Sequence, residues 1–145
     1  MYNTGQSVFE HACAELRNGQ KTEHWMWFIF PQLAGLGFSD MARRFAIASL
    51  EEAQAYLDHP FLGPRLRLCT QLVNTLSDRP INQILGSIDG LKFRSCMTLF
   101  ACATPDNELF RRALEKFCGG QADQSTLRML GLADRFGLPP SEGKA

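Results

Sequence analysis

The amino-acid sequence predicts an all-α protein, folded as a single multihelical bundle of about seven to eight short helices. Apolar residues recur at intervals of three and four along most of the chain, which is the spacing of one helix face. Capping residues stand before these segments, and glycine or proline stands after them. At 145 residues the chain has the length of one domain, without a repeat or a linker. We therefore expect one domain over residues 1–145, with residues 1–6 and 134–145 as frayed tails.

Two helices are predicted at the start of the chain. Ser7 and Glu10 form the pattern of a capping box, and the helix that follows ends at Gly19. The aromatic run at residues 25–30 fits a short helix that ends at Pro31. The same run also fits a strand, because apolar residues recur at every second position as well. We take the helix as the prediction.

Three helices are predicted in the middle of the chain. Ser39 can cap a helix over residues 40–47. Ser49 and Glu52 form a second capping box, for a helix that reaches about residue 57. In the third helix, helical spacing places five apolar residues on one stripe: Leu62, Leu66, Cys69, Val73 and Leu76.

A central helix is predicted in the second half of the chain. Pro80 opens a short helical segment that Gly86 closes. Ser87 or Asp89 can then cap a helix that continues to about Cys102. Apolar residues surround nearly the whole circumference of this helix, so we expect it to be the most buried one.

Two more helices are predicted after the central one. Residues 106–117 carry an amphipathic stripe that ends at Gly119. Asp123 or Ser125 can cap a last short helix that includes residues 127–130.

Composition and charge narrow the class of protein. Fifteen basic and fifteen acidic side chains cancel, so the net charge offers no attraction to nucleic acid or to an anionic membrane. The five cysteines lack the spacing of a zinc or redox motif and are expected to be reduced thiols. The N-terminus has no signal-peptide pattern, and no apolar run approaches the ~20 residues of a membrane-spanning helix. We expect a cytoplasmic protein without a metal or a cofactor, and the oligomeric state stays open.

The stretch KTEHWMWFIFPQLAGLG, residues 21–37, is the first candidate for a functional site. It holds Trp25 and Trp27, and aromatic residues this dense must lie in a core or line a deep pocket. His24 and Gln32 bracket the run. An imidazole between indole rings would be desolvated and its pKa lowered, which suits a general base or a hydrogen-bond acceptor. The alternatives are a core histidine bonded to a backbone carbonyl and tryptophans that only pack.

The central helix carries the second candidate. Lys92, Ser95 and Thr98 form a polar edge on an otherwise apolar helix, and this edge is costly to bury unless a pocket opens there. Asp89 lies three residues before Lys92 and can pair with it or point a carboxylate into the same opening. The alternatives are a solvated helix edge for Lys92 and a helix cap for Asp89.

A shared pocket would offset the cost of burying both segments, so we expect them to meet around one concavity. Its catalytic candidates are His24 and Asp89. Its ligand-binding candidates are Trp25, Trp27, Gln32, Lys92, Ser95 and Thr98.

Three segments of the sequence resemble one bacterial family: HWMWFIFPQLAGLG, SLEEAQAYLDHPFLGPRLRLCTQLV and GLKFRSCMTLFACATPDNELFRRALEKFCGG. In order and wording they resemble the family called domain of unknown function 1810 (DUF1810), whose members often carry the genome label calpastatin. The resemblance covers residues 8–130 and implies a small all-α domain without an established activity. The start of the chain, MYNTGQS, departs from the family pattern, which has an additional amphipathic turn with a Phe and a Gln.

Residues 92–130 are more loosely similar to the NADAR domains, helical proteins that cleave N-glycosidic bonds of ADP-ribose-linked or riboside substrates. This similarity implies tryptophans that stack a base, a phosphate neutralised by Lys92, and water or ribose polarised by Asp89 or His24. We therefore hypothesise a Trp/His-lined pocket that binds or hydrolyses a nucleotide-like or ADP-ribose-like small molecule. The alternative is a non-catalytic protein-interaction module that uses the aromatic surface.

Overall fold

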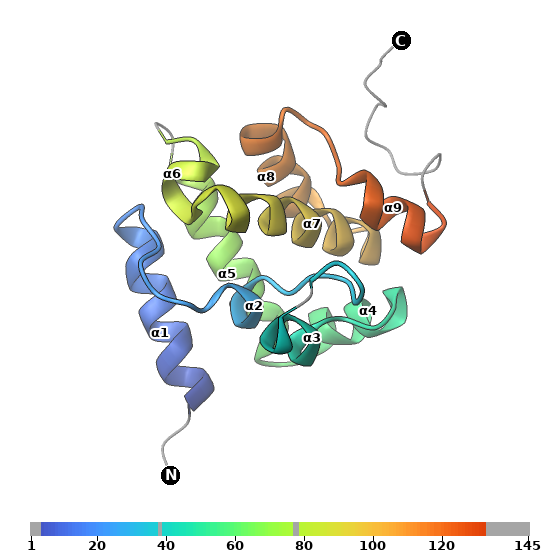
Figure 1. Ribbon diagram of the computed structural model, residues 1–145, viewed down its shortest axis with the longest axis horizontal. Helices are drawn as coiled ribbons and strands as arrows, with labels where there is room; N and C mark the ends of the chain where they lie inside the picture. Colours follow the sequence, from blue (N-terminus) through green and yellow to red (C-terminus); the bar gives the residue numbers. More distant parts are fainter. Residues whose placement is uncertain (1–3, 38, 77–78, 133–145) are drawn as a thin grey trace.

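The computed structural model of the protein describes residues 4–37, 39–76 and 79–132, and within these ranges the chain is all α-helical (Figure 1). The all-α prediction is therefore confirmed, with nine helices in the described residues. They are α1 (Thr4–Arg17), α2 (Met26–Ile29), α3 (Asp40–Phe45), α4 (Leu50–Asp58), α5 (Leu62–Asn74), α6 (Ile81–Leu85), α7 (Ser87–Ala103), α8 (Glu108–Cys118) and α9 (Gln124–Leu130).

Helix α7 is the centre of the bundle. It packs against α4, α6, α8 and α9, and Figure 1 shows it crossing the middle of the molecule. Ten of its 17 residues are buried, more than in any other described helix, so the prediction that it is the most buried helix is confirmed. Its first two turns differ from the predicted all-round apolar burial, because Ile88 and Leu91 are 71% and 66% exposed.

The helix starts follow the predicted caps in three cases. The side chains of Ser39, Ser49 and Asp123 each accept a hydrogen bond from the backbone N–H three residues later. Each bond satisfies a donor that the first helical turn leaves free. Helix α1 begins at Thr4, earlier than the predicted start at Ser7. The predicted tail residues 1–3 and 134–145 lie outside the described residues.

The junction between α6 and α7 corrects one prediction. Helix α7 begins directly after Gly86, and neither Ser87 nor Asp89 caps it. Gly86 has φ +97°, a conformation that glycine adopts without strain, so the chain turns here with no spacer for a side-chain cap. As a result Asp89 lies in the first turn of α7, where a carboxylate is favoured by the helix dipole.

The aromatic run forms the single turn of α2 and then continues as extended chain, so the strand alternative for this run is wrong. Beyond it, an isolated parallel bridge joins Leu33 to Ile47. The Ala34 N–H donates to the Ile47 carbonyl at 2.7 Å, and the Ile47 N–H donates to the Gln32 carbonyl at 2.8 Å. The bridge closes the base of a loop that carries α3; we call its described residues, 34–37 and 39–46, the α3 loop.

The described helices include none that is long and apolar enough to cross a membrane. All five cysteines are free thiols, as predicted.

Candidate functional site

A narrow cleft lies between α2, α3 and the start of α7. Its lining residues are Met26, Trp27, Phe30, Pro31, Gln32, Ala42, Phe45 and Lys92. The empty space is about 260 Å³ when the open mouth is included, but the interior has room for only about one water molecule. The cleft is therefore closed in this conformation, and a ligand needs one of its walls to move.

The walls of the cleft differ in how firmly they are held. Met26 and Ile29 are 1% and 3% exposed, so α2 is part of the core. Trp27 is half-buried and presents the rest of its indole ring to the cleft. The opposite wall is Ala42 and Phe45 of α3, a helix without a fully buried residue. It rests on α2 through an edge-to-face contact between Phe45 and Phe28, with ring centroids 5.7 Å apart.

Lys92 supplies the charge of the cleft. It is the one charged residue among those that line it in the described part of the chain. Its ammonium lies 3.8 Å from the Asp89 carboxylate, and its side chain is 33% exposed. Asp89 has a shorter contact, 2.9 Å, with the ammonium of Lys21. Lys92 is therefore the cation that a ligand in this cleft would meet.

Trp25 belongs to the core beside the cleft rather than to its lining. It is 2% exposed, and its indole Nε1 donates to Glu15 Oε1 at 2.9 Å. Burial raises the pKa of Glu15, but hydrogen bonds from Thr22, Trp25 and the Glu23 backbone outweigh it and lower the pKa to about 2. The carboxylate thus stays charged and holds Trp25 in place.

His24 lies on the surface. Its side chain is exposed, so the expectation of a desolvated imidazole between two indole rings is wrong. Of the two neighbouring tryptophans, Trp25 is buried in the core and Trp27 lines the cleft.

Ser95 and Thr98 are buried and satisfied by the protein itself. The Ser95 hydroxyl donates to the Leu91 carbonyl at 3.3 Å. The Thr98 hydroxyl donates to the Arg94 carbonyl at 2.8 Å and accepts from the Asp123 N–H at 2.8 Å. Neither residue lines the cleft. Apart from Lys92, the polar side chains on this edge of α7 are therefore satisfied by hydrogen bonds within the helix and to the loop before α9.

The structure thus brings three of the eight predicted residues into one cleft, namely Trp27, Gln32 and Lys92, and places Asp89 beside Lys92. Two residues at or beside the cleft, Lys21 and Phe45, were not predicted from the sequence. Lys21 opens the aromatic stretch and could have been noticed as its nearest cation. Phe45 had no signal, because nothing in the sequence shows that α3 folds back over α2.

No group of three or more His, Cys, Asp or Glu side chains in the described ranges is arranged to hold a metal ion. The residues that line the cleft offer an aromatic surface, one side-chain amide and one ammonium.

The fold and the cleft together define a small all-α protein with a closed aromatic cleft that carries one cation. The chain belongs to the DUF1810 family, described as a protein of unknown function, whose model matches residues 1–130. It is similar to the crystal structure of the conserved hypothetical protein Rv1873 from Mycobacterium tuberculosis, with 53% sequence identity and a TM-score of 0.85. That match covers 86% of this chain and 89% of the other. The search of curated proteins gave no match.

Proposed function

We propose that the cleft between α2, α3 and α7 binds a nucleotide-like or ADP-ribose-like small molecule. The observation that carries the proposal is the meeting of Trp27, Phe45 and Lys92 at one opening. A planar ring and a negative group are the two ligand features that such a set recognises.

Each residue has a role that follows from its chemistry. A base or nicotinamide ring packs between Trp27 and Phe45, where it gains contact area and favourable ring geometry. Lys92 pairs with a phosphate. The side-chain amide of Gln32 donates to and accepts from the edge of the ring or a ribose hydroxyl.

Entry of such a ligand requires the α3 loop to move. The cleft holds about one water molecule, whereas a nucleotide needs a cavity of roughly 300 Å³ or more. Helix α3 is the wall that can give way, because it buries no residue fully while α2 and α7 belong to the core.

Binding is better supported than hydrolysis. Cleavage of an N-glycosidic bond needs a carboxylate or a base near the developing positive charge. Asp89 is the acidic group nearest to Lys92, but it is paired with Lys21 at 2.9 Å, and His24 is exposed. A hydrolase would need Asp89 to leave Lys21 when the ligand binds.

A thermal-shift screen with AMP, ADP-ribose, NAD and simple sugars tests the proposal. At about 100 times its dissociation constant, a ligand stabilises the folded state by about 2.7 kcal/mol, which raises Tm by roughly 5–10 °C in a domain of this size. We expect the shift to be lost in Trp27→Leu and in Lys92→Met. It should persist in Arg112→Met, which removes only an exposed ion pair on α8.

The same samples, checked for released base or nicotinamide, distinguish a hydrolase from a binding protein. Absence of a shift with every compound, together with unchanged tryptophan fluorescence, contradicts the proposal. It would favour an interaction module, for which the exposed Ile88 and Leu91, one turn apart on α7, are the specific supporting observation.

A further inference from the structure

We propose that the ion pair between Lys21 and Asp89 sets the charge of the cleft. Lys21 takes up most of the Asp89 charge and leaves Lys92, 3.8 Å from the same carboxylate, as a largely uncompensated cation, so the cleft selects a planar ligand that carries a single anionic group. The ligand class rests on the proposed function, because it assumes that the ligand occupies this cleft. The assignment of the net positive charge to Lys92 does not rest on the proposed function.

The two lysines contact Asp89 unequally. Lys21 Nζ lies 2.9 Å from Asp89 Oδ2, within hydrogen-bond distance, whereas Lys92 Nζ lies 3.8 Å from Asp89 Oδ1, beyond it. The side chains of Lys21 and Asp89 are 8% and 19% exposed, so their pair is screened by solvent less than Lys92, which is 33% exposed. Two positive charges and one negative charge leave a net charge of +1, and this charge faces the cleft at Lys92.

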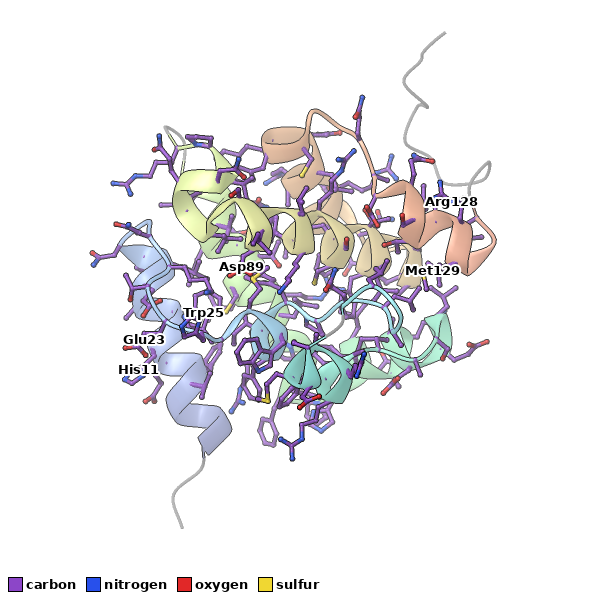
Figure 2. The ribbon with its side chains drawn as sticks, viewed as in Figure 1. His11, Glu23, Trp25, Asp89, Arg128 and Met129 are labelled. Carbon is purple, nitrogen blue, oxygen red and sulfur yellow. The ribbon has the colours of Figure 1, made fainter. Side chains whose placement is uncertain are left out.

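Lys21 is held in place by its backbone as well as by its side chain. Its backbone N–H donates to the Ile84 carbonyl, and its ammonium lies 5.3 Å from the centroid of the Trp25 ring. Trp25 is in turn fixed by its hydrogen bond to Glu15. In Figure 2, Asp89 on α7 lies above Trp25, which directly precedes α2. The pair is therefore a built feature rather than a chance contact between mobile surface chains.

The position of Asp89 explains why such a pair is needed. Asp89 lies one helical turn before Lys92, the spacing at which opposite charges attract each other on a helix surface. Without Lys21, the Asp89 carboxylate would turn to Lys92 and cancel its charge at the cleft. With Lys21 in place, the carboxylate stays nearer to Lys21 than to Lys92. Trp25, which holds Lys21, and Asp89 are therefore positioning residues, because they affect the ligand only through the charge of Lys92.

The same geometry limits the ligand to one negative group near Lys92. Lys92 is the one charged residue among the described residues that line the cleft, so a second phosphate group would find no cation of its own there. Among nucleotide-like molecules, a nucleoside monophosphate therefore fits better than the diphosphate of ADP-ribose.

Quenching of Trp27 fluorescence tests the charge assignment without a ligand. Iodide, an anion, concentrates near a positive cleft, whereas neutral acrylamide reports access alone. Trp25 is 2% exposed and contributes little to quenching, while Trp27 and Lys92 line the same cleft. The readout is the ratio of the iodide to the acrylamide quenching constant, measured at constant low ionic strength because salt screens the effect.

The two single variants are chosen so that they change the net charge in opposite directions. The net charge of the three residues falls from +1 to 0 in Lys21→Met, rises to +2 in Asp89→Asn and returns to +1 in the double variant. We expect the quenching ratio to fall about twofold in Lys21→Met, to rise in Asp89→Asn, and to return to the wild-type value in the double variant. Lys92→Met should lower the quenching ratio, as Lys21→Met does.

A pair that only fastened the loop before α2 to α7 would behave differently. Breaking it from either side would loosen the same contact, so both single variants would change in the same direction and the double variant would not recover. Equal ratios in all variants, or shifts of one sign, overturn the inference. If one single variant folds poorly, the test still rests on the other single variant and on the double variant, whose quenching ratio must return to the wild-type value.

A second measurement separates this inference from the proposed function. Thermal shifts should be larger with AMP than with ADP-ribose in the wild-type protein, and both should be lost in Lys21→Met, although Lys21 does not line the cleft. An AMP shift that persists in Lys21→Met overturns the inference. If the wild-type protein binds neither compound while the iodide pattern holds, the proposed function fails and the charge assignment stands.

Discussion

Glu15 shows how one carboxylate organises the chain before the cleft. Its two oxygens accept hydrogen bonds from the Thr22 N–H, the Thr22 hydroxyl, the Glu23 N–H and the Trp25 indole, at 2.8 to 3.2 Å. These bonds fold the residues after α1 back along the helix and bring Trp25 into the core. The charged form of Glu15 is the one that accepts all four.

Acid should therefore destabilise the protein through Glu15. Because folding lowers its pKa from 4.5 to about 2, its contribution is complete above pH 4.5 and is lost as the pH falls toward 2. Solvent screens this partly exposed group, so we expect about 1 kcal/mol. In urea unfolding at pH 7, the free energy of unfolding of Glu15→Gln should be lower than that of the wild type by this amount. The difference should shrink at pH 3. A difference that does not change with pH would contradict the assignment.

Thr98 and Ser95 make a matched pair for testing whether the polar edge of α7 is structural. In Thr98→Val the partly buried Asp123 N–H loses its partner, and an unpaired donor costs about 1–3 kcal/mol when it is shielded from water. In Ser95→Ala only a bond within α7 is lost, so we expect less than about 1 kcal/mol. Chemical denaturation measures both. Two equal and small effects would show that the hydroxyl of Thr98 does not hold the start of α9.

At the scale of elements, the α3 loop is the least anchored wall of the cleft. Its base is fixed by the bridge between Leu33 and Ile47, both of which are buried, whereas α3 itself has no fully buried residue. An element that buries little surface opens at a small free-energy cost while its neighbours stay folded. We therefore expect the α3 loop to open about this fixed base while the rest of the domain stays folded.

Amide hydrogen exchange, followed by NMR, checks this motion directly. We expect the Arg43 N–H, which donates to the Ser39 carbonyl within α3, to exchange at least about tenfold faster than the Ile47 N–H at the base. The difference should narrow in the presence of a bound ligand. Equal protection of the two amides would mean that α3 opens only when the whole domain unfolds.

The sequence predicted most helices because their signals are local. Ser39, Ser49 and Asp123 cap the helices that they precede, and the apolar pattern of α7 identified the central helix. The start of α7 was misplaced, because Gly86 makes the turn and no side chain is needed there. Local signals thus determine where helices lie, within a few residues.

The candidate site was predicted less well because it depends on contacts between distant segments. Trp25 and Trp27 are two residues apart, yet one is buried against α1 and the other lines the cleft. Lys21 lies 68 positions before Asp89 in the numbering, and no sequence spacing reveals that they pair. Residue types alone suggested the right segments, and only tertiary packing decided which side chains meet.

At the scale of the whole molecule, Phe93 joins the two halves of the bundle. It is fully buried, with its ring 5.1 Å from that of Phe30, which follows α2, and 6.3 Å from that of Phe117 in α8. Both contacts are edge-to-face, a favourable arrangement for aromatic rings. The cleft side and the α8 side therefore share one core.

Phe93→Ala should lower the free energy of unfolding by about 3–5 kcal/mol, because it removes a buried ring and leaves a cavity. Phe61→Ala is the control: Phe61 is 64% exposed, so we expect a change of less than about 1 kcal/mol.

Tryptophan fluorescence reports on the segment around α2, since both tryptophans lie there, and far-ultraviolet circular dichroism reports on all helices. In a domain with one core the two signals change at the same denaturant concentration in both variants and in the wild type. If fluorescence changed first in Phe93→Ala, the segment around the cleft would be a separate folding unit that Phe93 attaches to the helices behind it.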